Sequence, residues 1–182
     1  MKKFAVLTFA TLALVALPLN AQSIFLGAGA AIPTGEDMDG VSTGFQLVGG
    51  ATFDVASQLS IYGEGSWGTH GTDFDGVDAK PYAFMAGLLF DLTSDEDAPV
   101  TPYVYGGAGM QWVKLTDGED DISDSAFGFQ FGAGLGFALG GLDAWAEGRY
   151  ARAAFDEDSD FGDFNFANFG ITAGLSFNLG GN

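Results

Sequence analysis

Apolar and small residues alternate along residues 126–139. The odd positions carry an apolar row, and the even positions carry a small or polar row: Phe127, Phe129, Phe131, Ala133, Leu135, Phe137 and Leu139 against Gly128, Gln130, Gly132, Gly134, Gly136 and Ala138. Successive side chains of a β-strand point to opposite faces, so this order predicts a strand, whereas a helix would mix the two rows. Neither row carries a charge. The pattern therefore predicts a membrane-spanning strand with its Phe and Leu row against lipid and its glycine row against a narrow interior.

The same alternation recurs in seven further segments, which makes eight predicted strands. These strands cover residues 23–32, 43–55, 59–69, 80–92, 100–115, 126–139, 142–153 and 166–179. Long acidic loops are expected at 33–42, 70–79, 116–125 and 154–165, and shorter turns at 56–58, 93–99 and Gly140-Gly141. Long loops outside the cell and short periplasmic turns are typical of transmembrane β-barrels.

The strands are expected to close on themselves. Hydrocarbon offers no water to the backbone N–H and C=O groups, so an open sheet edge would leave several of them unpaired. We therefore expect an all-β fold, a closed eight-stranded antiparallel up-and-down transmembrane β-barrel. The interior of such a barrel is only wide enough for side chains to fill, which predicts a filled lumen without a diffusion pore.

A Gly-x-x-Phe pattern recurs at the end of every even-numbered strand. It places an aromatic residue just before a periplasmic turn or the carboxyl end, at Phe53, Phe90, Phe137 and Phe177. Aromatic residues at one height form an interfacial girdle in membrane barrels. Trp67 and Trp112, with Phe45, Phe127 and Tyr150, are expected to form the opposite girdle.

Three charged residues are expected inside the barrel. Glu64 lies on the inward row of one strand, and Glu147 and Arg149 lie on the inward row of another. Buried charges are normally paired, so both carboxylates are expected to pair with Arg149. A structural ion cluster is the favoured interpretation, and a gating or proton-relay role stays open.

The amino-terminal residues 1–21 are expected to be a secretory signal peptide. Lys2 and Lys3 precede an apolar stretch, residues 4–17, and Ala21 precedes a plausible cleavage point. The expected mature barrel domain, residues 22–182, then keeps four basic residues against 24 acidic ones, within a whole-chain net charge of -18. Such a charge argues against nucleic-acid binding. The chain has no cysteine, so it has neither disulfides nor thiolate metal sites.

Two neighbouring strands carry a family resemblance. The segment from Gly132 to Phe137, followed by Leu142 to Tyr150 with its Glu-x-Arg-Tyr, resembles the small outer-membrane β-barrel family related to OmpX and the OmpA transmembrane domain. The resemblance implies a monomeric barrel in the outer membrane of a Gram-negative bacterium, in contact with its lipid and lipopolysaccharide and inserted by the outer-membrane assembly machinery. It does not fix a biochemical role, because the family includes adhesins and structural anchors. Such barrels usually end on an aromatic residue, whereas here Phe177 lies five residues from the end.

The long loops concentrate the acidic residues. Sixteen of them lie at 36–39, 73–78, 117–124 and 156–163. Solvated, mutually repelling loops are the favoured interpretation, and divalent-cation binding is the alternative. Asp156, Asp158 and Asp160 imitate the start of a calcium-binding loop, although Phe161 stands where that loop needs glycine and Ala167 where it needs glutamate.

Two further classes of protein are weighed against a non-enzymatic barrel. His70, with Ser66 and Asp73 nearby, would suit a lipid A-modifying outer-membrane enzyme. Gly65-Ser66-Trp67 would suit a soluble lipocalin-like carrier of a hydrophobic ligand, which would turn the apolar rows inward. We expect neither, and no cofactor. The expected role is structural or surface interaction through the acidic loops.

Overall fold

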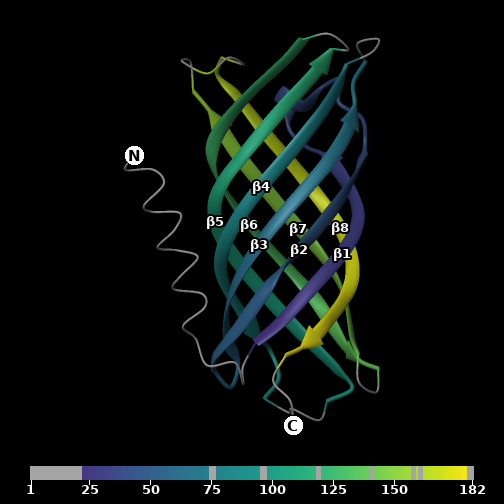
Figure 1. Ribbon diagram of the computed structural model, residues 1–182, viewed down its shortest axis with the longest axis vertical. Coiled ribbons are helices and arrows are strands. Elements are labelled where there is room, and N and C mark those ends of the chain that lie inside the picture. Colours follow the sequence, from purple (N-terminus) through teal and green to yellow (C-terminus); the bar gives the residue numbers. More distant parts are fainter. Residues whose placement is uncertain are drawn as a thin grey trace.

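The computed structural model is a closed barrel of eight antiparallel strands (Figure 1). The structure describes residues 22–73, 77–94, 98–117, 120–139, 142–156, 159 and 162–179. The strands are β1 (Gln22–Pro33), β2 (Gly44–Ala56), β3 (Leu59–Gly71), β4 (Asp78–Asp91), β5 (Val100–Asp117), β6 (Asp120–Ala138), β7 (Asp143–Phe155) and β8 (Phe164–Asn178), with a short 3-10 helix, η2, at Glu36–Met38. Each strand pairs with its neighbours in the sequence, and β1 also pairs with β8. The predicted fold class is confirmed.

The two ends of the barrel differ. β1 begins and β8 ends at one end, which we call the periplasmic end, and the connections β2–β3, β4–β5 and β6–β7 lie there (Figure 1, bottom). The connections that follow β1, β3, β5 and β7 lie at the opposite, extracellular end. The predicted signal peptide, residues 1–21, and the Gly140-Gly141 turn lie outside the described residues, so both stay predictions. The described residues include no helix long and apolar enough to cross a membrane.

The apolar rows face outward, as predicted. On β6, Phe127 is 68% exposed and Phe131 55%, whereas Gly128 and Gln130 of the alternate row are buried. Leu26 on β1 is 65% exposed. Because a large apolar surface of this kind is costly in water, the outer face of the barrel is suited to lipid.

Glycines on the inner face of β6 make room for tyrosines of β5. A Cβ atom on Gly132 would lie 2.7 Å from the Tyr105 ring, and one on Gly134 would lie 2.4 Å from the Tyr103 ring. Register pairs these residues, Tyr105 with Gly132 and Tyr103 with Gly134. The glycine row therefore exists because aromatic rings from the adjacent strand occupy the space that its side chains would need.

The strands extend further at the extracellular end than the alternation predicted. The predicted loop at 116–125 is wrong: β5 and β6 stay paired as far as Asp117 and Asp120. The predicted loop at 154–165 is wrong at both ends, because Phe155 pairs with Phe164. The physical reason is that charged and polar side chains are excluded from a strand only where its outer face touches lipid. Beyond the membrane, a hairpin accepts them on either face.

The predicted aromatic girdle residues lie near the strand ends. Phe90, Phe177, Trp67 and Trp112 face outward, with exposures between 38% and 43%, and Phe137 is half-buried. Phe53 lies on the same strand face as Leu47 but is only 7% exposed. The residues Phe53, Phe90, Phe137 and Phe177 all fall within the last four residues of their strands. We take the two aromatic rows as the limits of the membrane-spanning part.

Candidate functional site: a filled lumen with a periplasmic cavity

Arg149 lies at the centre of the lumen between two carboxylates. Its Nη1 donates to Glu64 Oε1 at 2.5 Å, and its Nη2 donates to Glu64 Oε2 at 3.2 Å and to Glu147 Oε1 at 2.7 Å. Arg149 is 3% exposed and Glu64 4%. The structure thus brings together the three charged residues that the sequence placed inside, and β3 is joined to β7 across the barrel.

Phenol and amide groups supply further hydrogen bonds around this ion cluster, and Arg149 Nε is left without a hydrogen-bond partner among the described residues. Tyr103 donates to Glu147 Oε2 at 2.9 Å, and Tyr105 donates to Glu147 Oε1 at 2.7 Å. Gln130 Nε2 donates to the Tyr62 hydroxyl at 3.1 Å. Buried charges cost several kcal/mol each to desolvate, so a buried ion pair is stable only when its remaining oxygens and protons find partners. The tyrosines and Gln130 supply these partners from β3, β5 and β6.

Small residues on β8 allow the arginine to occupy the axis. A Cβ atom on Gly170 would lie 2.4 Å from Gln46 Nε2 and 2.9 Å from Arg149 Cγ. Gln46 in turn donates to the Thr172 hydroxyl at 2.7 Å. A larger residue at position 170 would therefore push apart both the arginine and the glutamine.

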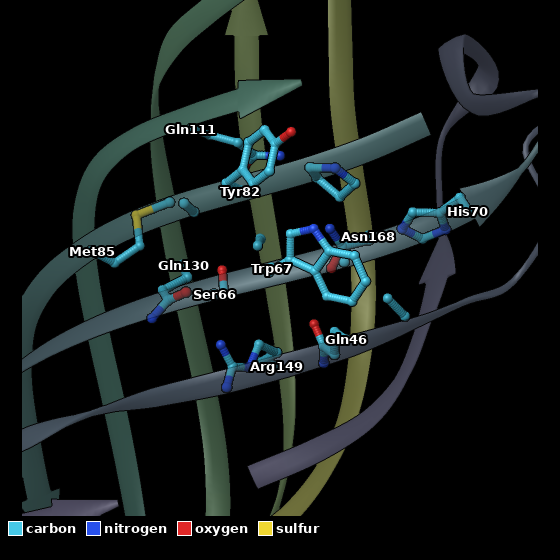
Figure 2. A pocket seen from close by; sticks show the side chains of 15 residues that line it. Gln46, Ser66, Trp67, His70, Tyr82, Met85, Gln111, Gln130, Arg149 and Asn168 are labelled. Carbon is cyan, nitrogen blue, oxygen red and sulfur yellow. The ribbon is translucent and has the colours of Figure 1, made fainter. Parts of the chain in front are cut away.

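A small polar cavity lies on the extracellular side of Arg149 (Figure 2). Its volume is about 30 Å³, enough for one or two water molecules, and its polar lining includes Gln46, Gln111, Gln130 and Asn168. His70 also lines it and is 1% exposed. The lining is therefore rich in side-chain amides, which donate and accept hydrogen bonds equally well.

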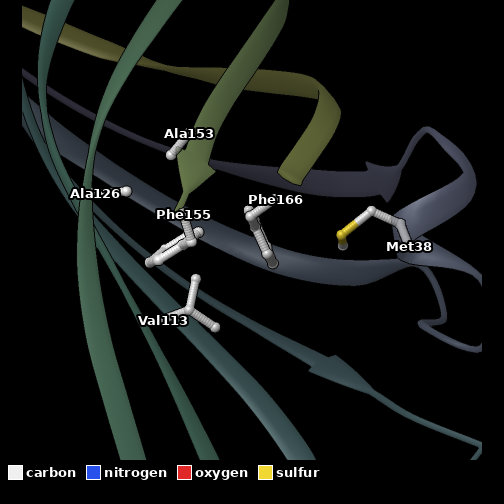
Figure 3. Close-up of a cluster of buried hydrophobic side chains, with 6 residues drawn as sticks. All are labelled: Met38, Val113, Ala126, Ala153, Phe155 and Phe166. Carbon is white, nitrogen blue, oxygen red and sulfur yellow. The ribbon is translucent and has the colours of Figure 1, made fainter. Parts of the chain in front are cut away.

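An apolar cluster fills the extracellular mouth. It contains buried side chains from four strands and the loop after β1, which are Met38, Val113, Ala126, Ala153, Phe155 and Phe166 (Figure 3). Phe166 is 2% exposed and Phe155 3%. Among the described residues, the extracellular mouth is therefore packed mainly with apolar side chains.

The lumen opens out again at the periplasmic end. A cavity of about 350 Å³ lies there, and Tyr62, Tyr103 and Trp145 form part of its wall. Glu64 and Glu147 of the ion cluster also line it. The lumen is therefore divided: a packed extracellular part, a central ion cluster, and a periplasmic cavity.

The candidate metal residues do not form a site in the described part of the chain. Asp156 is exposed, and Asp158 and Asp160 lie outside the described residues. Within the described residues, no group of three or more His, Asp or Glu side chains is placed to hold a metal ion. The metal hypothesis at Asp156 therefore stays untested.

Among the described residues, His70 is joined to neither Ser66 nor Asp73 by a hydrogen bond. Its Nδ1 donates to the main-chain oxygen of Ser42 at 3.0 Å, and its ring packs edge-on against Phe166 at 5.9 Å. Trp67, which a lipocalin-like carrier would need inside, is 38% exposed on the outer face.

The sequence reasoning missed the apolar cluster and the partners of Glu147. Val113 continues the inward row of Tyr103 and Tyr105, and Phe155 continues the inward row of Glu147 and Arg149. Following the alternation to the end of the predicted strand 100–115, and into the predicted loop 154–165, would have placed both side chains inside. No pattern in the sequence states which tyrosine bonds which carboxylate, because the partners lie on strands far apart in the chain.

A closed barrel with an apolar outer belt and a polar, packed interior is a transmembrane β-barrel of the bacterial outer membrane. The chain matches the model of the family described as "Outer membrane protein beta-barrel domain" over residues 6–177. The chain belongs to this family and is located in the outer membrane of a Gram-negative bacterium. No curated protein matches its sequence.

Solved structures of small outer-membrane barrels resemble this fold. Neisserial surface protein A is 18% identical with a TM-score of 0.70, over 86% of this chain and 96% of that one. A major outer membrane protein from Thermus thermophilus is 17% identical with a TM-score of 0.58, over 86% and 99%. Ail, the attachment invasion locus protein of Yersinia pestis, is 21% identical with a TM-score of 0.52, over 87% and 99%. At these identities the likeness shows the fold.

Proposed function

We propose that this protein is a non-enzymatic, non-conducting outer-membrane barrel whose acidic extracellular end binds cationic partners at the cell surface. The observation that carries the proposal is the division of the barrel into a packed lumen and an acidic extracellular end. The lumen is filled by the ion cluster of Glu64, Glu147 and Arg149 and by the apolar cluster at the mouth. Contacts with partners at the cell surface are then made by the extracellular loops and strand ends.

The charge at the extracellular end supports an interaction with cations. Glu36, Asp39, Asp73, Asp156 and Asp163 are all exposed there. Asp37 is held by two hydrogen bonds, from the main-chain and side-chain nitrogens of Asn165 at 3.0 and 2.8 Å. A surface with a large excess of one charge attracts oppositely charged partners over roughly a Debye length, about 8 Å at physiological salt. The name of the Yersinia pestis neighbour, attachment invasion locus protein, agrees with a surface role.

The position of His70 supports a structural role for the only histidine. A general base needs a free ring nitrogen within reach of a nucleophile and its substrate. Here Nδ1 is taken by the Ser42 carbonyl, and Nε2, which has no hydrogen-bond partner among the described residues, belongs to a ring that is only 1% exposed and packs against Phe166. Lipid A chemistry would require that ring to reach the membrane surface.

Two kinds of partner follow from the same proposal. The outer face would contact membrane lipid, and the acidic rim would contact lipopolysaccharide through divalent cations. Insertion by the outer-membrane assembly machinery, with Phe177 as the terminal aromatic signal, and a monomeric state belong to the proposal as well.

Neutralising the exposed extracellular acids tests the proposal. Cells that display the protein should bind fluorescent polylysine, and the variant Glu36→Gln/Asp39→Asn/Asp156→Asn/Asp163→Asn should bind several-fold less at low salt. Asp54→Asn/Asp91→Asn, changed at the periplasmic end, is the matched control and should bind as the wild type does. Equal polylysine binding by all three proteins would reject a surface role for these acids.

A further inference from the structure

We propose that the periplasmic cavity is a binding site for a small organic cation that also carries oxygen acceptors, such as a hydroxylated amine or amino sugar. The cavity lies below the ion cluster and at the opposite end from the acidic loops. The inference is independent of the proposed surface function. It rests on the charge of the cavity lining, on its aromatic wall and on one buried indole.

The lining of this cavity is acidic and carries no described basic side chain. Its five acids are Asp54, Glu64, Asp91, Asp143 and Glu147. Arg149 neutralises part of this charge from the central ion cluster, through Glu64 and Glu147. The other three acids have no ion pair among the described residues, so a negative potential is focused in a concave site.

The three unneutralised acids lie at the periplasmic strand ends. Asp54 accepts a hydrogen bond from the Ser60 hydroxyl at 2.7 Å, and Asp143 accepts one from Asn178 at 3.0 Å. These neutral donors orient the carboxylates without cancelling their charge. Asp91 is half-buried on β4. A cation entering from this end would meet all three before it reached the aromatic wall.

The arrangement of these acids favours an organic cation over a metal ion. A metal site needs several ligands that converge on one point, and the described acids do not converge in this way. Acids spread around a cavity of about 350 Å³ instead suit a larger, softer cation. This volume lies within the range of roughly 300–1,000 Å³ that is usual for small-molecule sites.

Aromatic side chains form the wall around the carboxylates. Phe25 packs edge-on against Trp145 at 6.1 Å, and Tyr62 packs edge-on against Tyr105 at 5.6 Å. All four rings line the cavity. Aromatic faces attract ammonium groups and cover the carbon skeleton that carries them.

Trp145 supports a ligand in this cavity independently of the acidic lining. It lines the cavity and is 8% exposed, and its Nε1–H has no hydrogen-bond partner among the described residues. A buried donor without an acceptor costs about 1–3 kcal/mol. An oxygen of the ligand would remove this cost, which is why the proposed cation carries hydroxyl groups and a simple alkylamine does not suffice.

Indole NMR of the purified full chain in detergent micelles tests the site. The chain has three tryptophans, and Trp67 and Trp112 face lipid, so only the Trp145 indole signal should shift when D-glucosamine is added. D-glucose has the oxygens without the charge, and 1,4-diaminobutane has the charge without the oxygens. Both should bind more weakly, and calcium chloride alone should leave the signal in place.

Calorimetric titration with D-glucosamine compares the binding affinity of the wild type with that of matched variants. Asp91→Asn should weaken binding about fivefold, equal to ~1 kcal/mol. Trp145→Phe keeps the ring packed against Phe25 and should weaken it by a similar factor. Asp163→Asn, at the extracellular end, should bind as the wild type does. An unmoved Trp145 signal, an equal response to glucose, diaminobutane or calcium, or unchanged affinity in Asp91→Asn would overturn the proposal.

Discussion

At the scale of single residues, Arg149 decides how the lumen is held together. It is the one described basic residue within the central ion cluster, and it joins Glu64 of β3 to Glu147 of β7. The other arginine of β7, Arg152, points the opposite way and donates to Asn165 Oδ1 at 2.7 Å on the exposed surface. Of these two arginines, three positions apart on one strand, Arg149 therefore faces the packed interior and Arg152 faces the outside.

This contrast predicts a difference in stability. Arg149→Ala should lower the free energy of unfolding by about 3–5 kcal/mol, because two buried carboxylates lose their counter-charge. Arg152→Ala should lower it by less than about 1 kcal/mol, as is usual for an exposed polar contact. Urea unfolding in lipid vesicles measures both, and adding Glu64→Gln to Arg149→Ala should recover part of the loss. Equal unfolding midpoints for the two single variants would contradict the central role of Arg149.

At the scale of strands, the extracellular ends behave as a small soluble core. Phe166 of β8 packs with Phe155 of β7, Val113 of β5 and Met38 of the loop after β1. The three strand side chains lie on inward rows at the extracellular end, and Met38 reaches them from the 3-10 helix η2. The mouth of the barrel is therefore closed by the same hydrophobic effect that builds the core of a water-soluble protein.

Truncating one ring tests this closure. Phe166→Ala should lower the free energy of unfolding by about 3–5 kcal/mol, because it leaves a cavity among packed side chains. Phe127→Ala is the control: its ring is 68% exposed on the lipid side, so lipid fills the space and the loss should be smaller. The comparison is again made by urea unfolding in vesicles. If Phe127→Ala proved as costly as Phe166→Ala, the mouth would not be a packed core.

The strands themselves could be predicted because one physical rule, a period of two, acts along each of them. Residues 126–139 show it without a break, and the structure agrees from Ala126 to Leu135, where the odd positions are exposed and the even positions are buried or half-buried. Beyond the membrane the rows carry charged residues, and the sequence therefore predicts loops there. The structure instead pairs Asp117 with Asp120 and Phe155 with Phe164. Inward positions of Glu64 and Arg149 followed from the same rule. Their distances, and the tyrosines that bond Glu147, depend on strand tilt and register, which no local pattern specifies.

At the scale of the whole molecule, the barrel carries many of its large apolar side chains on its outer surface, the reverse of a water-soluble protein. The rows of β6 and β8 turn Phe131, Phe169 and Ile171 outward, and between the two aromatic rows the inner row of the same strands is small or polar. In water such a surface would aggregate, whereas in a bilayer it needs no partner. The stability of the fold is therefore inseparable from the membrane that surrounds it.

A charge placed on the outer row tests this dependence on depth. Phe131 lies between the two aromatic rows on β6, so Phe131→Arg puts a guanidinium near the middle of the bilayer, where it should cost about 2–4 kcal/mol. Ser123→Arg is the matched control on the same outward row of the same strand: Ser123 is exposed and lies beyond the outer girdle, so the added charge meets water and should cost close to nothing. Unboiled samples of the outer-membrane fraction, run on a denaturing gel, separate folded from unfolded barrel. The Ser123 variant should be recovered folded in the outer membrane, and the Phe131 variant should be depleted there. Equal recovery of the two variants would mean that lipid does not surround the barrel at the height of Phe131, and the position of the membrane along the strands would have to be redrawn.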